Sequence, residues 1–134
     1  MFPAQTKILV VDDMSTMRKI VKKTLKNFGF SDITEADDGQ TAWPKLETAL
    51  EDGKPFQLVV SDWNMHGLTG IQLLKKVRGH VQMAKLPFIL LTAEAEKDNI
   101  VQAINAGVSA FIVKPFQAVQ LKEKLAQVHK AVSK

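Results

Sequence analysis

Residues 8–13 read ILVVDD, four consecutive apolar residues followed at once by two carboxylates. A short run of β-branched and aliphatic residues is typical of a strand buried on both faces, as in a parallel sheet covered by helices. Four more runs of this kind follow along the chain, and the sequence therefore predicts five strands: Ile8 to Val11, Ile33 to Ala36, Leu58 to Val60, Phe88 to Leu91 and Ala110 to Val113.

The segments between these runs have helical periodicity. Apolar side chains recur at intervals of three and four before Gly29, with Ser15 as the expected N-cap, and a second helix is expected over Gln40 to Leu50. Pro44 is a misfit there because it removes a helical hydrogen bond. Repeated alternation of strand and helix predicts an α/β sandwich. The periodic residues are Met17, Ile20, Val21, Thr24, Leu25 and Phe28, then Ile100, Ile104 and Gly107, and finally Leu121, Leu125, Val128 and Val132.

The composition excludes several classes of protein. A chain of 134 residues with 46% hydrophobic and 24% charged residues suits one globular domain. Because there are no cysteines, disulfides, thiolate metal sites and cysteine nucleophiles are excluded. No apolar run approaches the length of a membrane span, and the beginning, MFPAQTK, does not resemble a signal peptide. We therefore expect a cytoplasmic protein without membrane insertion.

The formal charge of +4 raises the question of nucleic-acid binding. The densest basic segment has the spacing of the solvated side of an amphipathic helix, and aromatic residues do not interleave with it. We therefore expect no nucleic-acid partner. The basic residues of this segment are Arg18, Lys19, Lys22, Lys23 and Lys26.

The residues that follow the predicted strands carry the chemistry. In an open parallel sheet the ligand site lies outside the carboxyl ends of the strands. The groups expected at that edge include three carboxylates, which repel one another unless a cation joins them. Oxygen ligands without Cys or clustered His favour Mg²⁺ over Zn²⁺. The strand-end residues are Asp12 and Asp13, Ser61 and Asp62, Thr92 and Ala93, and Lys114 and Pro115.

A lysine and a hydroxyl beside such carboxylates suit phosphoryl transfer, in which catalysis consists mostly of positioning and charge neutralisation. Lys114 and Thr92 would contact oxygens of the moving group. The acceptor would be a carboxylate, since aspartate is able to accept a phosphoryl group covalently. The spacing alone does not choose among the three aspartates.

The motifs VVDD, SDWNM, LTAEA and VKPF, in this order and each at a strand end, resemble the response-regulator receiver family. The stretches STMRKIVKKTLKNFGF and AEAEKDNIVQAINAGVSAFIVKPF are similar to its stand-alone chemotaxis branch. The resemblance covers essentially the whole chain. It implies a flavodoxin-like (βα)5 doubly wound fold with a five-stranded parallel sheet in the order 2-1-3-4-5, and one receiver domain over residues 1–134 without an output domain.

The resemblance also assigns roles to residues. Asp62 would accept the phosphoryl group, with Thr92 and Lys114 in contact with it, and the Lys114–Pro115 bond would be cis. A balance between two surface states would be shifted as Thr92 and the aromatic Phe111 move. Mg²⁺ would be held by Asp12, Asp13, Asp62 and the backbone carbonyl of Asn64. The partner surface would comprise Lys97, Ile100, Ile104, Val113 and Lys124.

Two positions depart from the family pattern. Phe111 stands where the chemotaxis pattern usually has tyrosine, and this residue is equally compatible with simple core packing. The segment MHGLTG replaces the usual M-P-x-M-x-G, which places His66 at the proline position next to Gly67. Such a loop should be less rigid. We hypothesise that His66 lets pH or a transition metal influence the site, although an exposed loop histidine without a role is the simpler interpretation.

The resemblance implies a switch that catalyses only its own phosphorylation and dephosphorylation and is not otherwise an enzyme. Its partners would be a chemotaxis histidine kinase, the flagellar motor switch protein and a phosphatase, and we expect a monomer. A phosphate sink or auxiliary chemotaxis regulator that does not bind the motor stays open. An aspartate-dependent phosphohydrolase is less favoured, because Asn64 occupies the second position of its D-x-D motif. A nucleotide-binding module is disfavoured because DMSTM lacks a phosphate-cradling loop.

Overall fold

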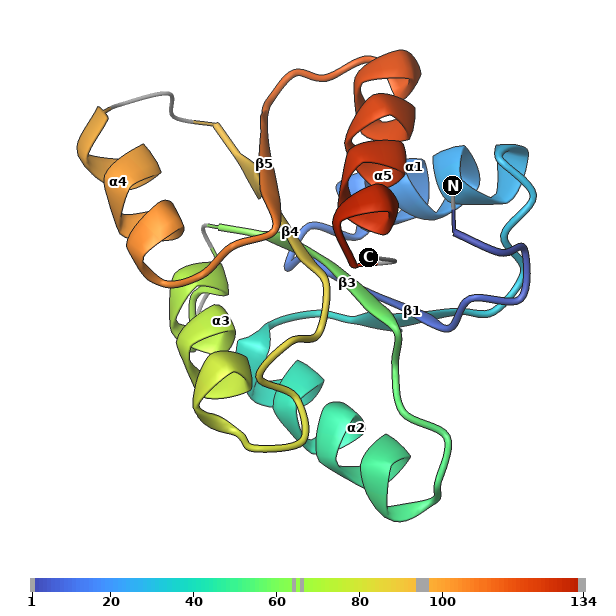
Figure 1. Cartoon of the computed structure of the whole chain (residues 1–134). Helices are drawn as coiled ribbons and strands as arrows, with labels where there is room; N and C mark the ends of the chain where they lie inside the picture. Colours follow the sequence, from blue (N-terminus) through green and yellow to red (C-terminus); the bar gives the residue numbers. More distant parts are fainter. Residues whose placement is uncertain (1, 64, 66, 94–96, 133–134) are drawn as a thin grey trace.

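The computed structural model describes residues 2–63, 65, 67–93 and 97–132, except for the side chains of residues 97 and 98. Within this part of the chain, strands and helices alternate as the sequence predicts (Figure 1). The elements are β1 Ile8–Val11, α1 Ser15–Asn27, β2 Ile33–Ala36, α2 Gly39–Glu51, β3 Leu58–Asp62, α3 Gly70–Gly79, β4 Phe88–Thr92, α4 Lys97–Asn105, β5 Ala110–Val113 and α5 Ala118–Val132.

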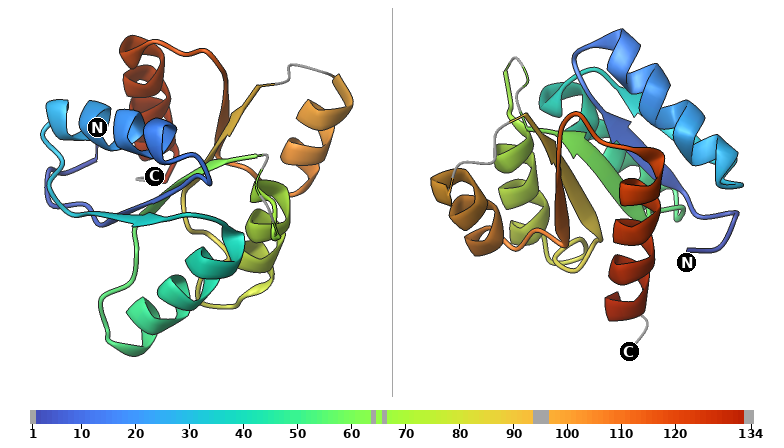
Figure 2. Two further views of the ribbon diagram at one scale, coloured as in Figure 1. Left: turned by 180° about the vertical axis from the view of Figure 1, so that it is seen from behind. Right: turned by 90° about the horizontal axis from the view of Figure 1, so that it is seen from above.

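The strands form one parallel sheet in the order β2-β1-β3-β4-β5. Helices α1 and α5 cover one face, and α2, α3 and α4 cover the other (Figures 1 and 2). This is the flavodoxin-like doubly wound sandwich, and both the fold class and the strand order are confirmed.

Alternation along the strands divides the core into two layers. Leu9 and Val11 of β1 belong to the cluster beneath α2, α3 and α4, whereas Ile8 and Val10 belong to the cluster beneath α1 and α5. All four side chains are at most 1% exposed. Successive side chains of a strand point to opposite faces, so a strand covered by helices on both sides must be apolar throughout. This explains why ILVV is continuous rather than alternating.

The structure corrects three details of the sequence prediction. Strand β3 extends to Asp62 and β4 to Thr92, whereas the sequence prediction ended these strands at Val60 and Leu91. Ser15 is the first residue of α1 and not its N-cap; Met14 holds that position without a side-chain capping bond. Two residues predicted to lie in apolar stripes are exposed: Ile20 of α1 is 50% exposed and Val132 of α5 is 48% exposed.

Helix α2 contains Pro44 in its interior. The helix continues because a capping box holds its first turn, in which the Asp38 carboxylate accepts from the backbone N–H of Thr41 and the Thr41 hydroxyl accepts from the backbone N–H of Asp38. Pro44 supplies no N–H to the carbonyl of Gln40, four residues earlier. The first turn of α2 therefore depends on its cap and its neighbours more than an ordinary helical turn does.

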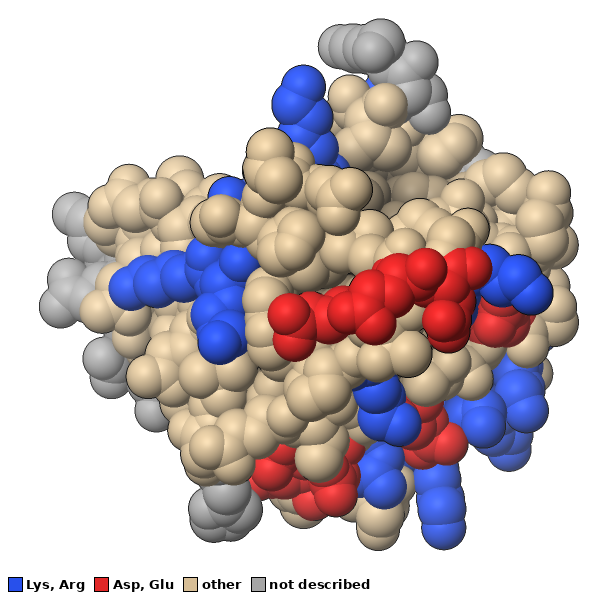
Figure 3. Space-filling view, turned by 90° about the horizontal axis from the view of Figure 1, so that it is seen from below, with Lys and Arg blue, Asp and Glu red and all other residues tan. Residues whose placement is uncertain are grey.

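The basic segment of α1 is only partly a solvated face. Lys19, Lys23 and Lys26 are exposed, as expected, but Arg18 and Lys22 are half-buried and pair with Glu35 of β2. Figure 3 shows acidic and basic side chains interspersed on the face toward α2, without a single basic patch there. No helix in the described ranges combines the length and apolarity required to cross a membrane.

Candidate functional site at the carboxyl edge of the sheet

Backbone hydrogen bonds position the polar residues at the strand ends. The N–H of Asp12 donates to Ala36 O at 3.1 Å, and the N–H of Lys114 donates to Thr92 O at 2.7 Å. The pairing of β3 with β4 extends past Asp62, since the N–H of Trp63 donates to Leu91 O at 2.8 Å. Because the strands are parallel, these residues lie at one edge, as predicted.

Three carboxylates meet at this edge. Asp12, Asp13 and Asp62 each present an oxygen, and these oxygens lie within 4.8 Å of one another. Asp12 is 1% exposed and Asp62 5% exposed, while Asp13 is half-buried. Such close, desolvated carboxylates repel one another, and binding of a cation or a proton would relieve this repulsion.

Lys114 supplies one positive charge. Its Nζ lies 2.5 Å from Asp62 Oδ1 and 3.8 Å from Asp12 Oδ2. The peptide bond between Lys114 and Pro115 is cis, as the resemblance implied. One ammonium group thus faces two buried carboxylates, with Asp13 beside them, so the negative charge of this group exceeds the positive charge of Lys114.

The pKa values of two aspartates reflect this imbalance. Burial raises the pKa of Asp62 above its ordinary value, and the hydrogen bond and charge of Lys114 offset only part of the increase. Burial likewise raises the pKa of Asp12; the N–H of Met14, which donates to its Oδ1 at 2.9 Å, acts in the opposite direction, and the charge of Asp62 adds to the increase. Both carboxylates are therefore poised to take up a cation or a proton.

The donor set fits a hard divalent cation. Asp12 Oδ2 is buried and accepts no hydrogen bond within the described part of the chain, although buried polar atoms normally have a partner. A cation ligated by this oxygen would satisfy it. Carboxylate oxygens are the ligands that Mg²⁺ uses in proteins. Asn64, the further ligand that the resemblance implied, lies outside the described residues, as does His66.

The residues expected to sense phosphorylation lie on β4 and β5. Thr92 is buried at the end of β4 and pairs with Val113 in the sheet. Phe111, two residues before Val113, is half-buried and packs against the core layer of α2, α3 and α4. Its ring therefore belongs to the core in this conformation. Thr92 and Phe111 lie on adjacent strands of the sheet.

The predicted partner residues lie on α4, β5 and α5. In Figure 1 these elements form one side of the molecule, with β5 between the two helices. Ile104 is 60% exposed, whereas Ile100, Val113 and Lys124 are half-buried. The side chain of Lys97, the first residue of α4, lies outside the described part. Two further exposed apolar residues, Val101 and Val119, were not singled out from the sequence.

Sequence reasoning also missed the role of Arg18. Its guanidinium donates to the backbone carbonyl of Asp12 at 2.8 Å and to Glu35 at 3.3 Å. It thereby joins the first turn of α1 to the segment that carries the carboxylates. Arg18 follows Asp12 by six residues, at the start of the helix, and this proximity was the available signal.

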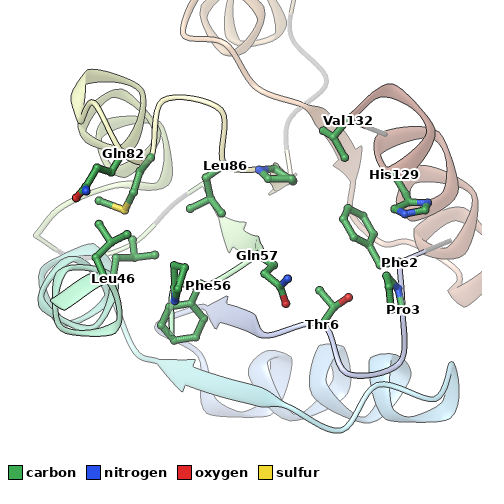
Figure 4. Close-up of a pocket in the computed structure, with 14 residues that line it drawn as sticks. Phe2, Pro3, Thr6, Leu46, Phe56, Gln57, Gln82, Leu86, His129 and Val132 are labelled. Atoms are coloured by element: carbon green, nitrogen blue, oxygen red, sulfur yellow. The ribbon is translucent and has the colours of Figure 1, made fainter. Parts of the chain in front are cut away.

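A separate crevice of about 460 Å³ lies at the opposite edge of the sheet (Figure 4). Its lining includes Thr6, Gln57 and Pro87, each located just before a strand, together with apolar residues such as Phe2 and Leu46. None of the three clustered aspartates borders it. The crevice is therefore distinct from the carboxylate site.

Comparison with known proteins agrees with this geometry. The chain is 47% identical over 127 residues to the chemotaxis protein CheY of Pseudomonas aeruginosa, covering 95% of this chain and 98% of that protein. It is 50% identical over 122 residues to the chemotaxis protein CheY-3 of Vibrio cholerae, covering 91% and 90%. Among solved structures, CheY4 of Vibrio cholerae superposes with a TM-score of 0.83 at 32% identity, covering 93% of this chain and 99% of that one.

The family model for the response regulator receiver domain matches residues 8–126. This range begins with β1 and ends within α5, and so it includes every strand-end residue of the carboxylate edge. With its sheet order, its cluster of aspartates and relatives that share about half of its residues, the chain belongs to the response regulator receiver family and is similar to the chemotaxis proteins of that family.

Proposed function

We propose that this protein is a phosphoryl-accepting switch of a chemotaxis pathway, in which Asp62 takes a phosphoryl group from the phosphohistidine of a kinase. The observation that carries this proposal is the ion pair of buried Asp62 with half-buried Lys114, beside the unsatisfied Oδ2 of Asp12. A salt bridge alone would not require two more carboxylates within 4.8 Å. A site that binds Mg²⁺ and a phosphoryl group would use all of these residues.

In the proposed reaction, an Asp62 oxygen forms a bond to phosphorus while the phosphorus–nitrogen bond of the phosphohistidine breaks, and the departing imidazole takes a proton from solvent. Mg²⁺, held by Asp12, Asp13, Asp62 and the Asn64 carbonyl, would supply positive charge at the phosphoryl oxygens. Lys114 would pair with one phosphoryl oxygen and Thr92 would donate to another. Attack of water on the phosphorus of the acyl phosphate would break its bond to the Asp62 oxygen, release inorganic phosphate and return Asp62 to its carboxylate, so the protein would catalyse only its own phosphorylation and dephosphorylation.

The output we propose is a change in the surface of α4, β5 and α5 that favours binding of the flagellar motor switch protein in the cytoplasm. Movement of Thr92 toward the phosphoryl group would draw Phe111 inward, shifting a balance between two states. The pairing of Thr92 with Val113 supports such coupling, because β5 carries both Val113 and Phe111.

The proposed chemistry is tested by intact mass after incubation with acetyl phosphate, with Mg²⁺ and then with chelator. We expect one added phosphoryl group that requires Mg²⁺ and is absent in Asp62→Asn. Asp32→Asn is the matched control, because Asp32 is exposed just before β2. A wild-type chain that gains no adduct, when another receiver is labelled under the same conditions, would refute the proposal. Turnover of p-nitrophenyl phosphate would instead favour a phosphohydrolase.

A second candidate function is a phosphate sink that drains a shared kinase without binding the motor. It is favoured by Phe111, which lacks the hydroxyl usual in the chemotaxis pattern, and by the His66-Gly67 departure beside the acceptor. The two roles differ in their partner. Phosphorylation-dependent binding of the motor switch protein supports the first role, whereas fast phosphotransfer from the kinase without such binding supports the second.

A further inference from the structure

The first turn of α2 contacts the segment that follows the acceptor strand. The backbone N–H of Gly39 donates to the carbonyl oxygen of Leu68 at 3.2 Å. Leu68 lies six residues after Asp62, in the segment between β3 and α3. A residue in the sequence-distant helix α2 is thereby joined to the segment next to the phosphorylation site.

This contact is possible because residue 39 is glycine. A Cβ on Gly39 would lie 2.5 Å from the carbonyl oxygen and 2.7 Å from the Cβ of Leu68. Carbon atoms do not approach so closely, and a backbone carbonyl has little freedom to move away. A side chain at position 39 would therefore push Leu68 and α2 apart. The φ of Gly39 is not positive, so contact rather than backbone conformation requires the glycine.

A second contact joins the same two segments. Gly67 has a φ of +70°, and a Cβ there would lie 2.9 Å from Cδ of the Gln40 side chain. Gln40 is also the residue whose carbonyl loses its helical donor to Pro44. Gln40 is therefore affected at two points. Gly67 leaves room for its side chain, and Pro44 leaves its carbonyl without a helical donor.

The far end of this segment is fixed on α3. The N–H of Gly70 donates to the carbonyl of Trp63 at 3.0 Å, and Thr69 caps α3 through a reciprocal pair of bonds with Gln72. A Cβ on Gly70 would overlap the carbonyl oxygen of Asp62. Leu68 is therefore held by the first turn of α2, and Gly70, two residues later, packs against Asp62 and Trp63 at the start of α3.

We infer that Gly39 is a positioning residue for the metal site, because its bare Cα and its amide hold Leu68, which leads into Gly70, the residue that packs against the carbonyl oxygen of Asp62. The inference rests on the proposed function, in which Asp62 ligates Mg²⁺. Outer-shell partners of metal ligands typically contribute about 10- to 100-fold in metal affinity. Gly39 does not touch the metal and acts only through Leu68. Helix α2 would consequently contribute to the metal affinity through Gly39.

The test compares Gly39→Ala with Gly79→Ala. Gly79 ends α3 without positive φ, and nothing lies within 4 Å of a Cβ added there, so its substitution controls for the added methyl group. Mg²⁺ affinity is measured from the fluorescence of Trp63, next to Asp62, in a Trp43→Phe background so that one tryptophan reports. We expect affinity to fall about 10-fold in Gly39→Ala and to stay unchanged in Gly79→Ala. Equal affinities in both variants would overturn the inference.

A measurement on the unsubstituted protein covers the case in which Gly39→Ala does not fold. We expect the amide resonance of Gly39 to shift on addition of Mg²⁺ with the midpoint seen for Trp63, while the amide of Gly53, beyond the other end of α2, does not move. A Gly39 amide that stays unchanged while Trp63 responds would overturn only this inference. Absence of any Mg²⁺ response would overturn the proposed function and this inference with it.

Discussion

The ammonium nitrogen of Lys114 lies 3.8 Å from Asp12 Oδ2, beyond hydrogen-bonding distance of an oxygen that is buried and accepts no hydrogen bond within the described residues. The same nitrogen lies 2.5 Å from Asp62 Oδ1. Lys114 therefore satisfies one carboxylate and leaves the other desolvated. Without metal, the site carries a cost in stability.

Replacing Asp12 by asparagine should stabilise the metal-free protein. The substitution removes the charge of a buried carboxylate whose pKa is raised by burial. It keeps a side-chain oxygen that accepts from the N–H of Met14. We expect the free energy of unfolding to rise by about 1 to 2 kcal/mol, measured by urea denaturation in chelator. Asp32→Asn is the exposed control. A less stable Asp12→Asn protein would show that Asp12 is stabilising without metal.

Replacing Asp62 by asparagine should also stabilise the metal-free protein, because burial of this carboxylate outweighs its pairing with Lys114, and the gain should depend on pH. Burial raises the folded-state pKa of Asp62 above its ordinary value of 3.8, so as pH falls the folded protein binds a proton before the unfolded chain does. The wild type therefore gains stability as pH falls through the folded-state pKa, and the gain is complete below the unfolded value. In chelator, the advantage of Asp62→Asn should be largest near pH 7 and shrink toward pH 4. A gap that widens on acidification would contradict this sign.

At pH 7, Mg²⁺ should make the wild type more stable than Asp12→Asn, which is the reverse of the order expected in chelator. A ligand that binds only the folded state stabilises it in proportion to the logarithm of its concentration. We expect the melting temperature of the wild type to rise with Mg²⁺ and that of Asp12→Asn to respond much less. Ca²⁺ at equal ionic strength controls for selectivity, and NaCl controls for screening. Equal responses of both proteins to Mg²⁺ would place the binding site elsewhere.

Removing the charge of Lys114 should separate metal binding from phosphoryl transfer. In Lys114→Met the cation that faces Asp12 and Asp62 is lost, so Mg²⁺ should bind more tightly by several-fold. Labelling by acetyl phosphate should nevertheless slow by about 10-fold or more, because a phosphoryl oxygen loses its partner. Lys130→Met, on the exposed surface of α5, is the control. Labelling of Lys114→Met at the wild-type rate would show that Lys114 takes no part in phosphoryl transfer.

Arg78 should stabilise the turn between α4 and β5. Its half-buried guanidinium donates to Gly107 O at 2.8 Å and to Leu86 O at 2.7 Å, and it lies 3.4 Å from the hydroxyl of Ser109. We expect Arg78→Gln to lower the free energy of unfolding by about 1 to 3 kcal/mol and to speed hydrogen exchange around Gly107. Lys75→Gln, exposed on the same helix, should change neither. Unchanged exchange would show that the turn is held by other contacts.

Much of the fold was predictable because the strand signal is unambiguous. A continuous apolar run such as ILVV has no polar side chains to place toward solvent, so it must be buried on both faces. Strands β1, β2 and β5 have the predicted bounds. The carboxylate edge was predictable from the same signal, since parallel strands bring their carboxyl ends together. The extension of β3 to Asp62 was missed because a polar residue that ends a buried strand looks like the start of a loop.

Other features depend on contacts that a sequence does not display. Pro44 argues against a helix by propensity, but the Asp38–Thr41 capping box and the packing of α2 outweigh that preference. Arg18 looked like one of five solvated cations until the structure placed it beside Asp12. Gly39 has no side chain that could reveal its role in the sequence. The positioning role inferred for it comes entirely from the close approach of Leu68.

The pairing of Glu35 with Arg18 and Lys22 has a consequence for solubility. β2 lies at an edge of the sheet and offers unpaired backbone groups to any other extended chain. Glu35 sits within this short strand and carries two charged partners from α1, each side chain still reached by water. A foreign strand added beside β2 would strip water from these ions without replacing their interactions. The ion pairs of Glu35, whose partner Arg18 also donates to the backbone carbonyl of Asp12, therefore protect the β2 edge of the sheet against edge-to-edge aggregation.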